Sequence, residues 1–430
     1  MKIHFINIGC KVNFVELSRL KEEFSRLNFE INDAIEGSDI ILINTCSVTS
    51  KAEADSRKLI RRVKRINPDS FIGVLGCYAQ LNPKEILETT DADAVFGINE
   101  KFNIPQIIKE KFEQKQNTNL CLVDSINNNF DYAYSGDNES RTRAIIKLQD
   151  GCNYKCTYCT IPLARGNSRS IEFEKILPQI EHIYNSGFKE IVLTGINLSD
   201  YNYDNKNFYD VLRLISSINL PLRFRISSIE PNIIKTELLD IITNSTNICP
   251  HFHIPLQSGC DDILKKMRRR YNTTQFRKYI ELINSYMPNA CIGLDVITGF
   301  PTENNYLFKE TYDFINSLNI TYIHCFSYSK RANTIAASMK EQVNNEDKRY
   351  RTNELLKISK EKTLKYYNDN INKELSLLPE RFDQDNKIVK GHTENYIPIT
   401  LYNQQALNNE FYKVKIDSVA NNIVKASLVK

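Results

Sequence analysis

The sequence lacks any long apolar run, any leader-like N-terminus and any large net charge. No apolar run reaches the length of about 18 residues that a membrane span needs, which argues against a membrane protein. The first ten residues, MKIHFINIGC, resemble a β-strand rather than a cleavable signal, so we expect a cytosolic protein. A formal net charge of +4 permits an RNA partner without requiring one.

Cysteine, by contrast, is abundant, with eleven residues in the chain. Thiols stay reduced in the cytosol, so metal binding or catalysis is a better interpretation than disulfide bonding. Six of the cysteines fall into two groups of three, described below. We assign no role to the isolated ones, because a free cysteine is commonly a small buried hydrophobe. These are Cys121, Cys249, Cys260, Cys291 and Cys325.

The first group, Cys10, Cys46 and Cys77, lies in a stretch where short apolar runs alternate with helical patterns. This alternation predicts a parallel α/β sheet over residues 1–112. Each of the three cysteines directly follows an apolar run, at the point where the chain turns towards a helix. The carboxyl ends of parallel strands meet at one edge of a sheet, so we expect the three thiols to share one crevice.

The second group lies in DGCNYKCTYC, where Cys152, Cys156 and Cys159 form a C-x3-C-x2-C pattern after the apolar run AIIKLQ. Three thiolates on one tight loop suit a soft metal. A structural zinc would need a fourth Cys or His, which the loop lacks, and zinc remains the alternative. A [4Fe–4S] cluster usually takes four cysteines, so three would leave one iron open.

The remaining segments complete a three-part organisation of the α/β class. Residues 113–143 are polar and predict a linker with one short strand. Residues 144–370 contain six strand-like runs with helical patterns between them, which predicts a partial (β/α)6 barrel. Residues 371–430 alternate as a small all-β barrel would. Basic clusters at 56–65 and 264–270 are either solvated helix faces or phosphate contacts.

The C-x3-C-x2-C pattern, with Tyr158 before its last cysteine, resembles the radical S-adenosylmethionine signature. The whole chain is similar to the methylthiotransferase family within that superfamily. The similar motifs occur in the family's order: GCKVN, NTCSVT, GCYAQ, GCNYKCTYCTIPLARG, SRS, LTGIN, SSIEP, HIPLQSGCDDILKKMRRRY and GHTENY. The resemblance implies a methylthiotransferase N-terminal domain at 1–112, a radical domain at 144–370 and a TRAM domain at 371–430.

The resemblance also implies two [4Fe–4S] clusters and S-adenosylmethionine as cofactors. An auxiliary cluster would take Cys10, Cys46 and Cys77, and its sulfur would be methylated by one S-adenosylmethionine. The radical cluster would take Cys152, Cys156 and Cys159, and a second S-adenosylmethionine bound there would yield the radical that activates C2 of an adenine. By analogy with the family, the residues that line the S-adenosylmethionine pocket would be Tyr158, Gly195, Asn197, Ser228 and Glu230.

The motifs GCKVN and GHTENY resemble those of the subgroup that acts on N6-threonylcarbamoyladenosine at position 37 of tRNA. The implied partners are the anticodon stem-loop of tRNA, an electron donor such as flavodoxin or ferredoxin, and a sulfur donor. Two alternatives stay open. One is a methylthiotransferase for isopentenyladenosine 37, whose relatives tend to have GCQMN, or for a ribosomal protein aspartate, whose relatives tend to have GCPKN. The other is a non-catalytic RNA-binding protein whose cysteines hold zinc.

Three loop or strand-end positions depart from the family pattern. Thr302 occupies a position that is usually Gly, and Ser327 and Asn333 stand where relatives often have Pro and Gly. These departures concern local backbone geometry rather than the six cysteines.

Overall fold

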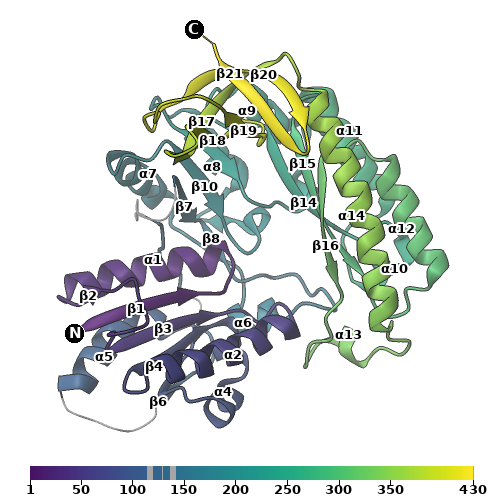
Figure 1. Cartoon of the computed structure of the whole chain (residues 1–430). Coiled ribbons are helices and arrows are strands. Elements are labelled where there is room, and N and C mark those ends of the chain that lie inside the picture. The colour runs from purple at the N-terminus through teal and green to yellow at the C-terminus, as the bar shows by residue number, and fades with distance from the viewer. Residues whose placement is uncertain (114–119, 128, 136–141, 430) are drawn as a thin grey trace. The chain divides into compact units, whose positions relative to one another are not determined.

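The structure is a computed structural model that describes residues 1–113, 120–127, 129–135 and 142–429 (Figure 1). The chain divides into two compact units. The first is formed by Met1–Ser135, Ile145–Ile171 and Ser329–Ala337, and the second by Glu172–Tyr328, Ser338 onward and the short segment before Ile145. Among the described residues, no helix has the length and apolar character that crossing a membrane requires.

A six-stranded parallel sheet in the order β2-β1-β3-β4-β5-β6 forms the centre of the first unit. Its strands are β1 (Lys2–Asn7), β2 (Glu30–Ile31), β3 (Ile40–Thr45), β4 (Phe71–Gly76), β5 (Ala94–Phe96) and β6 (Leu120–Leu122). The helices between them are α1 (Lys11–Arg26), α2 (Ser50–Ile66), α3 (Cys77–Leu81), α4 (Pro83–Thr89) and α5 (Ile104–Glu113). The short strand predicted within the polar 113–143 segment is therefore β6, which extends this sheet. Residues 114–119, 128 and 136–141 of that segment lie outside the described residues.

Helices cover both faces of this sheet, so its central strands are buried on both sides and read as continuous apolar runs. Leu17, Leu20 and Phe24 form an apolar stripe along α1, at helical spacing, and pack with α5 residues in one core cluster. Ile60 and Val63 of α2 belong to a second cluster with residues of α3 and α4. Figure 1 shows α1 and α2 on opposite faces of the sheet.

A loop with its own small hairpin completes the first unit. Strands β8 (Gln149–Asp150) and β9 (Arg169–Ser170) pair antiparallel and close the base of the loop that carries Cys152, Cys156, Cys159 and α6 (Ile161–Arg165). Gly151 has a φ of 68°, and a Cβ there would lie 2.0 Å from the carbonyl oxygen of Asn167. Only glycine fits this crossing of the two ends of the loop.

The second unit contains parallel strands in two sheets, β13-β10-β7 and β14-β15-β16, of which β7 (Arg143–Lys147) begins in this unit. The other strands are β10 (Glu190–Thr194), β13 (Arg223–Ile226), β14 (His251–Gln257), β15 (Cys291–Thr298) and β16 (Tyr322–Ser327). The helices that connect them are α7 (Ile176–Asn185), α8 (Phe208–Ser216), α9 (Thr236–Thr243), α10 (Asp261–Lys266), α11 (Thr273–Tyr286) and α12 (Asn305–Ser317). The hairpin of β11 (Asn202–Tyr203) and β12 (Lys206–Asn207) also belongs to this unit, whereas α13 (Ile335–Ser338) begins in the Ser329–Ala337 segment of the first unit. The six predicted strands of residues 144–370 are all present.

A closed five-stranded barrel in the order β17-β18-β19-β21-β20 follows the long helix α14 (Asn345–Asn368). Its strands are β17 (Glu374–Asp383), β18 (Ile388–Thr393), β19 (Pro398–Leu401), β20 (Tyr412–Ala420) and β21 (Ile423–Leu428). Arg225 of β13 donates to the backbone oxygens of Thr393 and Glu394, at 3.1 and 3.0 Å, and pairs with the buried Glu190 of β10. The small all-β barrel and the α/β class predicted from the sequence are both confirmed.

Candidate active site

Cys10, Cys46 and Cys77 lie at the carboxyl ends of three neighbouring parallel strands. Cys10 precedes α1 as its N-cap, Cys46 directly follows β3, and Cys77 follows β4 as the first residue of α3. Because β1, β3 and β4 are adjacent in the sheet, the three residues share one sheet edge, as the sequence pattern predicts.

Electrostatic interactions link the three sulfurs of this first triad. Burial, together with the charges of Cys77 and Cys10, raises the pKa of the Cys46 thiol to about 11, although the Val48 N–H opposes the shift. Burial also raises the pKa of Cys77, while the nearby Arg165 guanidinium lowers it. Three thiolates this close together repel one another, so a cationic centre is needed to hold all three ionised.

Arg165 connects the loop of the second triad to the first triad. Its side chain is completely buried, and its Nε donates to Cys77 Sγ at 3.3 Å. Its terminal nitrogens donate to Glu16 at 3.0 and 3.1 Å and to Asp150 at 3.0 Å. Arg165 is the last residue of α6, and α6 packs against α3, the helix that begins at Cys77. The two cysteine groups are thus built into one compact unit.

The charges around Arg165 form a buried network in which cations outnumber anions. Lys101 and Lys147 donate to the two oxygens of Glu16, at 2.5 and 3.1 Å. Arg165, Lys101 and Lys147 are cations and Glu16 and Asp150 are anions, all with side chains 0–2% exposed. Arg169, 10% exposed, adds a further cation 3.2 Å from Asp150. Burial raises the pKa of Glu16, but the cations outweigh it and lower that pKa well below its usual value. A site with this excess favours an anionic group beside Cys77.

Asn13 ties the first cysteine to the same network. Cys10 Sγ donates to Asn13 Oδ1 at 3.2 Å, and Arg165 donates to the same oxygen at 3.0 Å. The Asn13 amide donates in turn to Asn44 Oδ1 at 2.8 Å and to the Thr45 backbone oxygen at 3.1 Å. The asparagine of GCKVN therefore orients Cys10 and fastens it to β3.

Cys152, Cys156 and Cys159 are partly exposed on the loop between β8 and β9. Two backbone N–H groups point at the sulfurs, from Tyr154 to Cys152 at 3.3 Å and from Ile161 to Cys159 at 3.4 Å. Such N–H···S bonds favour the thiolate form. Tyr158 is partly buried within this loop.

The other predicted cofactor residues lie in the second unit, at the carboxyl ends of the neighbouring strands β10 and β13. Gly195 and the buried Asn197 follow β10, and Ser228 and Glu230 follow β13. Glu230 forms an ion pair with Arg269. Burial raises the pKa of Glu230, and Arg269 opposes that shift.

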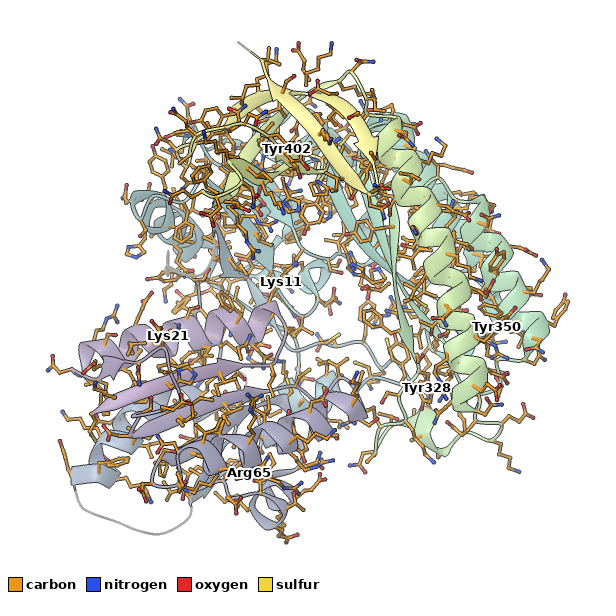
Figure 2. The ribbon with its side chains drawn as sticks, in the orientation of Figure 1. Lys11, Lys21, Arg65, Tyr328, Tyr350 and Tyr402 are labelled. Carbon is orange, nitrogen blue, oxygen red and sulfur yellow. The ribbon has the colours of Figure 1, made fainter. Side chains whose placement is uncertain are left out.

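Some cations of the two basic clusters, at 56–65 and 264–270, bond to other side chains or backbone groups of the protein. On α2, Arg57 donates to Tyr78 Oη at 2.6 Å and to Glu85 at 2.8 Å, and Arg61 donates to the Thr89 backbone oxygen at 2.6 Å. Arg62 and Arg65 are exposed on the same helix, and Figure 2 labels Arg65. In the second cluster Arg269 is paired with Glu230. Phosphate contacts would therefore rest on a subset of each cluster.

Sequence reasoning did not identify Arg165, Glu16, Lys101, Lys147 or Asp150 as site residues. A signal was available for two of them, because Glu16 interrupts the apolar face of α1 and Lys147 interrupts the apolar run AIIKLQ. A charge at a position that the pattern buries requires a buried partner. Which partner it finds depends on the tertiary structure.

Comparison with known proteins agrees with this arrangement. A family model described as "Uncharacterized protein family UPF0004" matches residues 2–97, and one for the radical SAM superfamily matches residues 146–315. A Bacillus subtilis protein named threonylcarbamoyladenosine tRNA methylthiotransferase MtaB is 36% identical over 425 residues, covering 96% of this chain and 93% of its own. The chain belongs to the radical S-adenosylmethionine methylthiotransferase family. The family prediction made from the sequence motifs is confirmed.

Two further similarities place this methylthiotransferase among its relatives. A Sulfurihydrogenibium protein named tRNA-2-methylthio-N(6)-dimethylallyladenosine synthase is 28% identical over 437 residues and spans 100% of this chain and 99% of its own. The radical S-adenosylmethionine methyltransferase TsrM of Kitasatospora setae is similar in fold, with a TM-score of 0.56 over 78% of this chain and 74% of that one, at 12% identity. Similarity at that identity concerns the fold alone.

Membership of the family implies S-adenosylmethionine and a [4Fe–4S] cluster as cofactors. The donor chemistry of the loop fits such a cluster. Cys152, Cys156 and Cys159 are all partly exposed, and two of their sulfurs receive backbone N–H bonds. Three thiolates leave one of four irons without a protein sulfur.

Proposed function

We propose that this protein methylthiolates C2 of N6-threonylcarbamoyladenosine at position 37 of tRNA. The observation that carries the proposal is the near-full-length similarity, at 36% identity, to a relative named for that substrate. The proposed domain division remains 1–112, 144–370 and 371–430.

In this proposal the six cysteines hold two [4Fe–4S] clusters. Cys10, Cys46 and Cys77 take an auxiliary cluster, and Cys152, Cys156 and Cys159 take the radical cluster. When bound, the two clusters and S-adenosylmethionine supply the electron, the 5′-deoxyadenosyl radical and the methylated sulfur of the reaction. An electron donor such as flavodoxin or ferredoxin and a sulfur donor complete the set of partners.

The buried charges around Arg165 would stabilise the auxiliary cluster electrostatically. A [4Fe–4S]2+ cluster bound by three thiolates carries a net charge of about −1, which the excess of cations around Arg165 would offset. The Arg165 Nε–H, at 3.3 Å from Cys77 Sγ, stabilises that sulfur as a thiolate and orients it. Arg165 is therefore proposed as a positioning residue for the auxiliary site.

The proposed S-adenosylmethionine-binding residues are Tyr158 in the cysteine loop of the first unit and, in the second unit, the strand-end residues Gly195, Asn197, Ser228 and Glu230. Asn197 supports this proposal because it is a buried polar side chain at the end of β10. Gly195 leaves backbone space for the cofactor rather than a side-chain contact.

Mass spectrometry of tRNA nucleosides tests the substrate directly. In a strain lacking this protein, we expect the 2-methylthio derivative of N6-threonylcarbamoyladenosine to disappear while unmodified N6-threonylcarbamoyladenosine accumulates. Complementation with the wild-type gene should restore the derivative, and a Cys77→Ala gene should not. Loss of the 2-methylthio derivative of isopentenyladenosine instead would assign the chain to the substrate of its dimethylallyladenosine relatives.

A further inference from the structure

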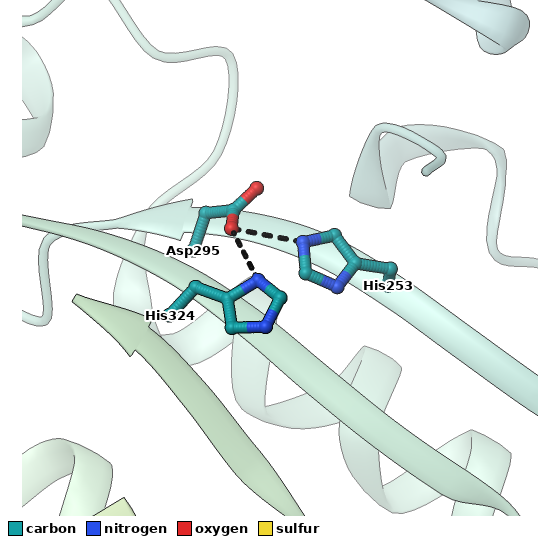
Figure 3. A group of neighbouring side chains, drawn as sticks. All are labelled: His253, Asp295 and His324. Atoms are coloured by element: carbon teal, nitrogen blue, oxygen red, sulfur yellow. Dashed lines mark ion pairs between the residues drawn. The ribbon is translucent and has the colours of Figure 1, made fainter. Parts of the chain in front are cut away.

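Three side chains of the second unit converge outside the cysteine sites. His253, Asp295 and His324 each offer one ligand atom, and these atoms all lie within 4.8 Å of one another (Figure 3). His253 Nε2 lies 2.9 Å and His324 Nδ1 lies 3.5 Å from the same oxygen, Asp295 Oδ1. Figure 3 shows both rings turned towards that carboxylate.

The strand register produces this convergence. His253 comes from β14, Asp295 from β15 and His324 from β16, three adjacent parallel strands. Asp295 is directly opposite His324, and His253 is opposite Gly293, two residues before Asp295. Side chains two residues apart on a strand point to the same face, so all three ligands project from one face of the sheet.

Tyr322 contacts the far side of the His253 ring and also a second histidine, His251. Tyr322 Oη lies 3.1 Å from His253 Nδ1 and 3.2 Å from His251 Nε2. The Tyr322 ring reaches β14 by crossing over Gly293, where a Cβ would lie 2.1 Å from Tyr322 Cζ. When Nδ1–H donates to Tyr322 Oη, the Nε2 lone pair of His253 points at Asp295 and can coordinate a cation.

The charge of the cluster favours a cation between the three groups. Asp295 supplies the carboxylate of the cluster, and both imidazole nitrogens face its Oδ1. Within the described chain, the ion pairs of Asp295 involve only these two imidazoles and no Lys or Arg. With neutral imidazoles the cluster therefore carries a charge of −1.

We propose that His253, Asp295 and His324 form a divalent metal site with two imidazole ligands and one carboxylate. Metal–ligand bonds of about 2.0–2.2 Å place neighbouring ligand atoms about 3 Å apart, close to the 2.9 and 3.5 Å found here. The His324 side chain is 55% exposed, which leaves room for exogenous oxygen ligands. This donor set suits Zn2+, Mn2+ or Fe2+. The inference does not depend on the tRNA substrate.

Titration with Mn2+ alone tests the site in the full-length, cluster-loaded protein. Mn2+ is a useful probe because it prefers oxygen and imidazole ligands to thiolates, so vacant cysteines compete poorly. The electron paramagnetic resonance signal of free Mn2+ should fall until one equivalent is bound. His253→Ala, Asp295→Ala and His324→Ala should each weaken binding by at least about tenfold, and Tyr322→Phe by about 10–100-fold. His182→Ala on α7 and Asp240→Asn on α9 are matched controls outside the cluster and should bind as wild type.

A second readout needs no variant. Electron spin echo envelope modulation of the bound Mn2+ in the wild-type protein should show coupling to two imidazole nitrogens. Absence of stoichiometric binding, binding without nitrogen coupling, or affinity unchanged in all three ligand variants would each overturn the proposal. In those cases the three side chains form a hydrogen-bonded cluster only.

Discussion

Replacing Arg165 with leucine should strongly destabilise the first compact unit. The substitution removes a completely buried guanidinium and its bonds to Glu16, Asp150, Asn13 and Cys77. Two carboxylates that are 2% exposed then lose their shared cation, although the lysines remain beside Glu16. Removing one partner of a buried ion pair costs about 3–5 kcal/mol.

Thermal unfolding of the cluster-free protein, followed by circular dichroism, measures this loss. For a unit of this size, about 1 kcal/mol corresponds to about 2–4 °C, so Tm should fall by about 6–20 °C. Arg62→Leu, an exposed arginine on α2 of the same unit, is the matched control and should change stability by less than about 0.5 kcal/mol. The double substitution Glu16→Leu with Arg165→Leu should recover part of the loss, because it removes both charges. A Tm for Arg165→Leu within about 2 °C of the wild-type value would contradict this prediction, because it would show that the network does not stabilise the fold.

Four other substitutions test local features. Thr302 has a φ of 73°, so Thr302→Gly should raise the free energy of unfolding by about 1 kcal/mol in denaturant titration, and Asn333→Gly, at a φ of 62°, by less. An unchanged or lower stability for Thr302→Gly would show that no strain is stored there. Gly293→Ala should lower stability by about 1–3 kcal/mol, because the new methyl group would meet Tyr322; a neutral effect would mean that the ring moves freely. The folded-state pKa of Asp295 is lowered to about 2, so its stabilising contribution is present above its unfolded pKa of about 4 and is lost as pH falls through about 2. The stability difference between wild type and Asp295→Asn should therefore shrink between about pH 4 and pH 2, and a constant difference would contradict the assignment.

Much of the fold could be predicted from local pattern. The alternation of apolar runs with amphipathic segments predicted the parallel sheet, and the position of each cysteine after such a run predicted the edge shared by Cys10, Cys46 and Cys77. These predictions succeed because strand ends in a parallel sheet are equivalent by topology. The polar 113–143 segment shows a limit of prediction from local pattern. Its short strand was predicted, but not that this strand, β6, pairs with β5 and so extends the first sheet.

The buried partners could not be predicted in the same way. Arg165 lies 149 residues from Glu16 and 88 residues from Cys77 along the chain, and no periodicity links positions so far apart. The convergence of His253, Asp295 and His324 depends on the order of β14, β15 and β16 and on the register between them. Local propensity fixes the strands, whereas these contacts follow from how the strands are paired.

The central claim is that each cysteine group holds its own iron–sulfur cluster. The most direct test is iron and labile sulfide analysis of anaerobically reconstituted protein, with zinc measured in parallel. We expect about eight irons in the wild type, and about four in a triple Cys10/Cys46/Cys77→Ala variant that still cleaves S-adenosylmethionine but transfers no methylthio group. A colourless protein with zinc and no iron, or a triple variant with full methylthiolation, would contradict the account.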